Sequence, residues 1–278
     1  MSAPAMPTAK GDAASGSGRF AAWLRRRIGL ILVFVALFLL WEYAVKIFGI
    51  KEYLLPPPTR IWTEFLKRWP TVMAGAWITG QEIVGGYLLA VVVSIPLALA
   101  VVRWRFVEES LYPVIVFLQI IPKIAIAPLF IIWFGFGFGP KLLIVFLLCF
   151  FPIVVSSVAG FKSLDPDVMD FARTTGAGGL RLFLKIRLPQ ALPGIFTGLK
   201  VGAALAATAA VVAEFVASDR GLGYLLQQYN GQLETPMVFA TIVLLSIMGL
   251  VVYYAVEWLE RLVIPWHVSQ RPNDVTGI

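Results

Sequence analysis

Few side chains in this sequence are of the types that carry out catalysis or hold a metal ion. There is one histidine, His267, and one cysteine, Cys149, which lies inside an apolar run. A histidine-based metal cluster, a Ser–His catalytic pair and a disulfide therefore have no residues to form them. The glycine-rich segments 135–139 and 221–223 lack the Lys-Ser/Thr or the third glycine of phosphate-binding loops. The sequence predicts no metal and no cofactor in this chain.

The charged side chains inside apolar runs are the groups that could act on a solute. If such a run crosses a membrane, a charge near its centre costs about 2.5–3.5 kcal/mol and needs a reason. Lys123 lies between Pro122 and Pro128, which weaken a helix because they lack a backbone donor. It either faces a translocation path or extends to the membrane interface. Glu214 and Glu82 lie near the ends of their runs, and an interfacial position is equally open to both.

The composition is strongly apolar for a chain of 278 residues. Hydrophobic residues make up 59%, charged residues only 14%, and the mean hydropathy is +0.83. A soluble fold of this length has too little core to hide so many apolar side chains. Disorder, a disulfide scaffold and a compact soluble enzyme are therefore disfavoured, and the sequence predicts a membrane protein that crosses the bilayer several times. The net charge of +7 lies mainly between the apolar runs and indicates membrane topology rather than nucleic-acid binding.

The apolar runs predict an all-α protein with six transmembrane helices. Each run is long enough to cross a bilayer at 1.5 Å per residue. The predicted crossings are 28–50, 78–102, 111–134, 142–161, 192–216 and 237–258. Together they form one domain, residues 21–265, between a disordered tail at 1–20 and a second tail at 266–278.

The distribution of basic residues predicts the orientation of these helices. With both termini in the cytoplasm, 14 lysines and arginines fall in cytoplasmic segments and 6 on the opposite side. The segment with three prolines, Pro56–Pro58, then lies outside, followed by a short amphipathic surface helix with Thr59 as its N-cap. Both predicted tails and the loop 162–190 lie in the cytoplasm.

The loop 162–190 is long, polar and mixed in charge, with intermittent apolar positions at helical spacing. Gly176 lacks a Cβ and would let a helix approach a partner surface closely. Leu188 and Pro189 are expected to end that helix before the fifth crossing. A rigid helix there would pass a push to both flanking crossings. From these residues alone, an amphipathic helix lying on lipid headgroups is an equally good interpretation.

Residues 170–189 resemble the EAA loop of ABC importer permeases, whose pattern is Glu-Ala-Ala, three residues, Gly, nine residues, then Ile-x-Leu-Pro. The spacing from Gly176 to Ile186 matches this pattern. The matching positions are Ala172, Gly176, Ile186, Leu188 and Pro189. Asp170 stands in place of the Glu, and Phe171 in place of the first Ala. Segments 118–137 and 213–224 are similar to the third-span and fifth-span signatures of the nitrate, sulfonate, taurine and pyrimidine-precursor group of these permeases.

The resemblance implies a type I ABC importer permease fold and the function of a permease subunit in the bacterial inner membrane. It implies three kinds of protein partner: two ABC ATPase subunits that bind ATP and Mg²⁺ and dock on the loop, a second permease copy, and an extracytoplasmic substrate-binding protein. The solute would be a sulfonate, nitrate or taurine-type anion, or a thiamine- or riboflavin-precursor heterocycle. A secondary transporter or channel without an ATPase is the alternative, and a membrane enzyme is disfavoured by the missing catalytic groups.

Small residues recur at every fourth position of the fifth crossing. They are Gly194, Gly198, Gly202, Ala206 and Ala210. Such a ridge lets two helices approach closely, which is a main source of helix association in lipid. Packing inside one subunit is the simpler interpretation. Because this crossing lies near the translocation path in the family, the resemblance also makes the ridge a candidate for the path. The predicted path residues are Pro122, Lys123, Pro128, Gly198, Gly202 and Glu214.

Overall fold

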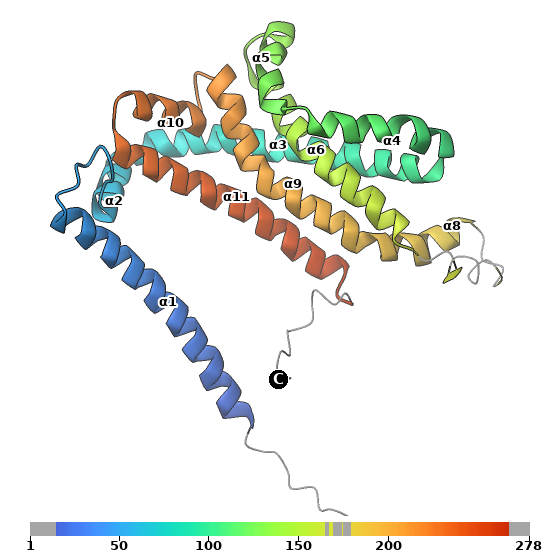
Figure 1. Ribbon diagram of the computed structural model, residues 1–278, viewed down its shortest axis with the longest axis horizontal. Coiled ribbons are helices and arrows are strands. Elements are labelled where there is room, and N and C mark those ends of the chain that lie inside the picture. The colour runs from blue at the N-terminus through green and yellow to red at the C-terminus, as the bar shows by residue number, and fades with distance from the viewer. Residues whose placement is uncertain (1–14, 165–166, 169–173, 175–178, 267–278) are drawn as a thin grey trace, which may run out of the picture.

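The computed structural model describes residues 15–164, 167, 168, 174 and 179–266, and every regular element in that part of the chain is a helix (Figure 1). The helices are α1 (Ser15–Ile47), α2 (Pro58–Lys67), α3 (Trp69–Arg103), α4 (Arg105–Ile120), α5 (Lys123–Phe134), α6 (Phe138–Lys162), α8 (Gly179–Leu182), the π-helix η1 (Phe183–Arg187), α9 (Leu188–Ala217), α10 (Leu222–Gly231) and α11 (Thr235–Val263). The predicted all-α fold is confirmed. Helix α1 begins at Ser15, inside the segment predicted as a tail.

The centre of the bundle is the contact between α6 and α9, with α3 packed against both. The small residues of α9 make this contact: a Cβ on Gly194 would lie 2.5 Å from the Cα of Gly160 on α6. On α3, a Cβ on Gly86 would lie 2.5 Å from the Cβ of Val145. Helices α6 and α9 therefore touch backbone to backbone, α3 packs closely on a side chain of α6, and dispersion contacts replace the hydrophobic effect that lipid does not supply. The prediction that the ridge serves close packing is confirmed.

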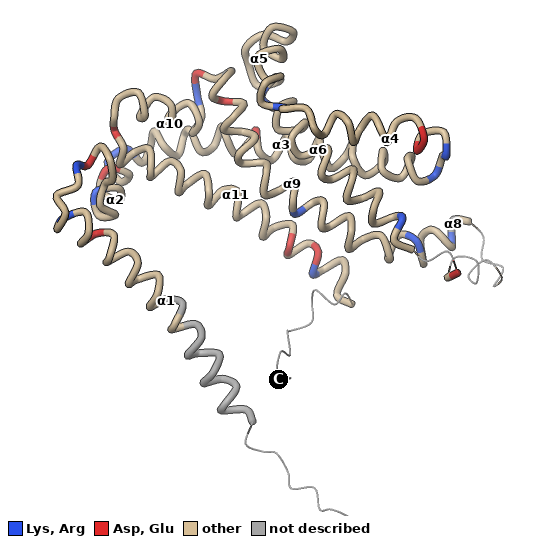
Figure 2. The backbone as a smooth tube through the Cα atoms, in the orientation of Figure 1, with Lys and Arg blue, Asp and Glu red and all other residues tan. Residues whose placement is uncertain are grey.

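Four described helices are long and apolar enough to cross a membrane, and the bent pair α4 and α5 forms a fifth candidate. Helix α1, which covers most of the predicted first crossing at 28–50, is not among these candidates, and the sixth crossing stays a prediction. Helix α1 diverges from the bundle and meets it only near α2 (Figure 1). Charged residues gather toward the helix ends and connections, and long stretches of α3, α6 and α11 carry none (Figure 2). We call the two ends of the bundle the α8 end and the α10 end.

The third crossing is not the single helix that the sequence predicts for 111–134. Helices α4 and α5 meet at an angle of 100° across Ile121 and Pro122. Both residues have extended backbone conformations, and Pro122 has no N–H with which to continue the ladder of α4. Pro128, in contrast, lies inside α5 without ending it. Pro122, just before the new helix, breaks the crossing, and the proline six residues later does not.

The predicted N-cap of α2 is also wrong. The residue before the helix is Pro57, and the Thr59 hydroxyl does not cap the helix. Instead, Glu42 of α1 accepts hydrogen bonds from the Thr59 backbone N–H at 3.1 Å and from its hydroxyl at 2.8 Å. A carboxylate near a helix N-terminus accepts hydrogen bonds from free N–H groups and interacts favourably with the positive end of the helix dipole. The cap therefore comes from another helix and fastens α1 to α2.

The proline at 189 does not end a helix, contrary to the expectation from the sequence. Helical structure runs from α8 through η1 into α9 without a break. Pro189 cannot donate to the carbonyl four residues earlier, and the preceding turn widens so that the Leu188 N–H bonds to the Phe183 carbonyl. A π turn thus absorbs the proline, and the end of the loop 162–190 is rigidly continuous with the fifth crossing.

Candidate functional site

Part of the predicted coupling loop lies beside a groove at the α8 end. Asp170, Phe171, Ala172 and Gly176 lie outside the described residues. The other three predicted residues, Ile186, Leu188 and Pro189, are half-buried in η1 and the first turn of α9. Ile186 and Pro189 line a groove of about 790 Å³ whose opposite wall includes Ser156, Gly160 and Ser163 of α6. A surface groove beside a helix that continues into a crossing can receive a partner and pass its movement to the bundle.

Lys123 lies at the break between α4 and α5 and is already engaged there. Its ammonium donates to the backbone carbonyl of Gln119 at 2.6 Å and lies 4.8 Å from the centre of the Phe151 ring. The carbonyl is one of those that the end of α4 leaves without a helical partner. The lysine thus caps the end of α4, while its neighbour Pro122 and the more distant Pro128 are exposed. A role in a solute path remains a prediction for all three residues.

The predicted path residues Gly198 and Gly202 are buried on the face of α9 that contacts α6. A Cβ on Gly198 would lie 2.8 Å from the Ser156 Cβ, and one on Gly202 would lie 2.9 Å from the Ile153 Cδ1. In this conformation both glycines serve the helix contact. Their assignment to the path also stays a prediction.

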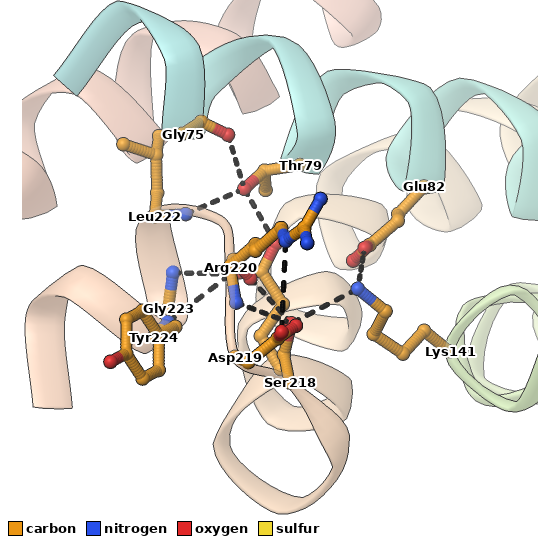
Figure 3. Close-up of polar contacts among 11 residues, drawn as sticks. Gly75, Thr79, Glu82, Lys141, Ser218, Asp219, Arg220, Leu222, Gly223 and Tyr224 are labelled. Atoms are coloured by element: carbon orange, nitrogen blue, oxygen red, sulfur yellow. Dashed lines mark hydrogen bonds and ion pairs between the residues drawn. The ribbon is translucent and has the colours of Figure 1, made fainter. Parts of the chain in front are cut away.

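Glu214 is the centre of a buried polar cluster at the α10 end, and Figure 3 labels its partners Thr79, Gly223 and Tyr224. Its carboxyl accepts hydrogen bonds from the Thr79 hydroxyl at 2.6 Å, from the Gly223 N–H and from the Tyr224 N–H at 3.4 Å. Thr79 in turn accepts from the Leu222 N–H at 2.8 Å. These donors include the first N–H groups of α10, which no helical carbonyl satisfies. Glu214 is thus closed off from solvent here, and its hydrogen bonds anchor α10 to α9 and α3.

Gly221 makes this arrangement sterically feasible. Its φ of +104° is a conformation that residues with a side chain rarely adopt, and a Cβ there would collide with the Glu214 carboxyl. The glycine therefore lets the chain turn directly over the carboxyl before α10 begins.

Glu82 and Lys141 extend the cluster to α6. They form an ion pair, and the Lys141 ammonium also donates to the Ser218 hydroxyl at 3.0 Å (Figure 3). Glu82 is fully buried, and Lys141 is 6% exposed. Together with Glu214 they connect α3, α6, α9 and the turn before α10. Among the described residues, no group of three or more His, Cys, Asp or Glu side chains could hold a metal ion.

The α8 end holds a simpler ion pair. Lys200 of α9 and Glu260 of α11 lie 2.8 Å apart, with side chains that are 23% and 5% exposed. One acid meets one base, so the pair is balanced in charge.

A charged surface lies on the α10 end beyond the cluster. Arg68, before α3, makes two hydrogen bonds with Glu234, before α11, and lies over the Tyr229 ring at 5.5 Å. Hydrogen bonding to Glu234 raises the pKa of Arg68 above its usual range. The Lys67 ammonium lowers the pKa of nearby Glu64. Glu64, Arg68 and Glu234 line a pocket of about 410 Å³.

Sequence analysis missed Thr79 and Lys141 and interpreted Glu82 too cautiously. A useful signal was present: three ionisable residues, Glu82, Lys141 and Glu214, occur at or near the same ends of the predicted crossings 78–102, 142–161 and 192–216. Charged groups at matching depth in lipid are expected to find one another. Thr79 gave no comparable signal, because buried threonines often bond only to their own helix.

These features define a multi-pass, all-α membrane protein whose described residues contain no catalytic set. The family model of the binding-protein-dependent transport system inner membrane component matches residues 86–265. The chain belongs to this family, and the resemblance drawn from its motifs is confirmed. It is the permease subunit of a binding-protein-dependent importer and not an enzyme, which removes the secondary transporter and the channel as alternatives.

Individual relatives support the same assignment. The formylaminopyrimidine transport permease protein ThiX of Halalkalibacterium halodurans is 34% identical over 86% of this chain and 96% of the relative. The riboflavin transport system permease protein RibX of Chloroflexus aurantiacus is 34% identical over 87% and 91%. The taurine transport system permease protein TauC of Escherichia coli is 30% identical over 88% and 92%.

A solved structure gives the fold. A chain of the MetNI methionine ABC transporter in an inward-facing conformation superposes with a TM-score of 0.62 and 18% identity, covering 71% of this chain and 98% of that chain. The predicted type I importer permease fold is confirmed by this likeness.

Proposed function

We propose that this permease imports a small nitrogen heterocycle of the pyrimidine-precursor or flavin kind. The observation that carries the proposal is the similarity to ThiX and RibX, each 34% identical, against 30% for the taurine permease TauC. The state of Lys123 supports it. The only charge that the sequence offered for binding an anion is engaged by the Gln119 carbonyl and the Phe151 ring.

The ATPase subunits would dock at the α8 end. The groove beside Ile186 and Pro189 supports this, as does the unbroken helix that links η1 to α9. Two copies would bind ATP and Mg²⁺ and, as they close, push on the loop 162–190 and turn the path outward. We expect Gly176→Leu to insert into the membrane but to lose its ATPase on copurification. Retention of the ATPase with normal transport would contradict this docking site.

A second copy of the permease would cover α5. The break at Ile121 and Pro122 and the turn through Gly135 and Gly137 are non-helical, and the exposed side chains there include Phe136 at 81%. Irregular backbone at membrane depth is not tolerated against lipid and requires protein or a water-filled cavity beside it. A homodimer with the solute path between its copies satisfies this requirement.

The orientation follows the distribution of charge. The α8 end and both termini would lie in the cytoplasm of a bacterial cell, and the α10 end would face the extracytoplasmic binding protein across the surface around Arg68 and Glu234. Lipid would cover the remaining apolar faces of the helices.

Uptake in cells tests the proposed solute. Cells that lack this chain and cells that express it with its own ATPase and binding protein would be given labelled riboflavin, a formylaminopyrimidine or taurine. We expect uptake of one heterocycle to require the chain and to persist in excess unlabelled taurine. Chain-dependent uptake of taurine, without uptake of either heterocycle, would contradict the proposal.

A further inference from the structure

The buried cluster at the α10 end contains more acid than base. Glu82 and Glu214 are both fully buried, and Lys141 is the only cation among the described residues that pairs with either carboxyl. The nearby Asp219 and Arg220 are 85% and 73% exposed and pair with each other. They therefore do not balance the cluster. If both glutamates were ionised, the three residues would carry a net charge of −1 inside the membrane.

The two glutamates differ in their hydrogen-bond donors. Glu214 accepts from Thr79, Gly223 and Tyr224. No backbone or hydroxyl donor in the described part of the chain reaches either oxygen of Glu82, whose ion-pair partner there is the Lys141 ammonium.

The carboxyl groups of Glu82 and Glu214 lie close together, because Thr79, whose hydroxyl donates to Glu214, lies three residues before Glu82 and therefore on the same face of α3. An ionised carboxyl only accepts hydrogen bonds, so two ionised carboxyls cannot bond and repel each other instead. A hydrogen bond between them requires a proton. The same proton would remove the excess charge, which a low-dielectric site does not tolerate without a partner.

We propose that Glu82 and Glu214 hold one proton between them, which makes the cluster with Lys141 electrically neutral within the membrane. The proton supplies the donor that Glu82 lacks and leaves Glu214 free to accept from the turn before α10. The neutral cluster can then remain dry and join α3, α6, α9 and α10. The inference does not depend on which solute the protein carries.

Infrared spectroscopy of the purified protein at neutral pH tests the proposal directly, because a protonated carboxyl has a carbonyl stretch separate from that of carboxylates. We expect the wild type to show this band and both Glu82→Gln and Glu214→Gln to lose it. After either substitution one acid remains with Lys141, and both groups are ionised.

Glu260→Gln is the matched control. Glu260 is also buried but is paired one to one with Lys200, so its substitution should leave the band unchanged. The absence of the band in the wild type, or its survival in Glu82→Gln, would overturn the proposal. These two samples decide the question even if Glu214→Gln does not fold.

Thermal unfolding gives a second, independent measurement. Glu82→Gln keeps one acid and one base, and its amide can donate to Glu214 in place of the shared proton. The double variant Glu82→Gln/Glu214→Gln leaves Lys141 buried without an acid. We expect the double variant to lower Tm at least about twice as much as Glu82→Gln, because an unpaired buried charge is the larger perturbation. Equal shifts in Tm would contradict the charge balance.

Discussion

The two ends of the bundle are held together by different interactions. At the α8 end, α6 and α9 contact each other through Gly160 and Gly194 with almost no side chain between them, and a groove opens beside this contact. At the α10 end, α3, α6 and α9 are joined by the cluster around Glu214, which also fixes the turn before α10. The contact between α6 and α9 at one end depends on close approach of the backbones, with the Lys200–Glu260 ion pair joining α9 to α11 beside it, and the other end depends on a larger set of directed polar contacts.

This difference indicates which end can change shape at low energy. Contacts between small residues are short-ranged, and helices joined in this way can slide without leaving a polar group unpaired. Opening the α10 end instead requires separating an ion pair and several hydrogen bonds in a medium of low dielectric constant. A push delivered at the groove would therefore move the α8 end first, with the cluster acting as the fixed point.

The largest expected effect comes from placing a side chain in the contact between Gly194 of α9 and Gly160 of α6, at the α8 end. Gly194→Val would put a Cβ 2.5 Å from the Gly160 Cα, where only backbone could give way. We expect destabilisation by about 4 kcal/mol or more and a strong loss of folded protein in detergent, measured by size-exclusion yield and Tm. Gly139→Val is the control, because a Cβ on Gly139 meets nothing within 4 Å. If the two variants are equally stable, the packing of α6 against α9 does not depend on contact between their backbones.

The second largest loss of stability is expected at the α10 end, from Gly221→Ala. The added methyl group must occupy a left-handed conformation and the position of the Glu214 carboxyl, which together should destabilise the protein by about 3 kcal/mol. Gly135 also has a positive φ but has open space around it. Gly135→Ala therefore measures the cost of the backbone conformation alone, about 1 kcal/mol. Chemical unfolding of the two variants would measure the difference. An equal loss would mean that the Glu214 carboxyl does not need the space beneath Gly221.

These two glycines illustrate what the sequence could predict. The ridge containing Gly194 was visible because its spacing repeats along one helix face, and the interpretation as a packing surface is correct. Gly221 lay in a recognised family motif, but its role depends on a carboxyl seven residues earlier that turns back under the loop. Spacing within one helix is local information, whereas contact between a loop and a neighbouring crossing depends on the tertiary fold.

A smaller effect is expected from Thr79→Val. It removes the hydroxyl between Glu214 and the Leu222 N–H and leaves the latter buried without an acceptor. The expected loss of stability is about 2 kcal/mol. Thr241→Val is the matched control, because Thr241 is also fully buried but donates only to Met237 of its own helix. The cluster has no special role if the Thr241 variant is the less stable of the two.

The broken third crossing and the π turn before α9 show a second limit of the sequence. Pro122, Pro128 and Pro189 are the same residue in three apolar or amphipathic contexts, yet one breaks a helix, one is accommodated inside a helix and one is absorbed by a wider turn. Each outcome depends on whether neighbouring helices hold the flanking turns in place. The all-α class and the crossings predicted at 78–102, 142–161, 192–216 and 237–258 agree with the structure, because hydropathy and length largely determine them.

The smallest effect is expected from Lys123→Met. This residue lies at the break between α4 and α5 and takes no part in the contacts compared above at the α8 and α10 ends. Lys123 engages a carbonyl of its own segment and an aromatic ring, and methionine keeps the unbranched stem while it removes the charge. If the solute is an uncharged heterocycle, uptake should stay within about twofold of wild type, the change expected for a surface substitution of about 0.5 kcal/mol. Lys141→Met provides the contrast, since it removes the only base of the buried cluster and should lower the yield of folded protein.

A strong loss of uptake in Lys123→Met with normal yield and normal basal ATPase activity would mean that the lysine meets the solute during transport. That result would favour an anion, and rescue by Lys123→Arg would then distinguish the charge from the shape of the side chain.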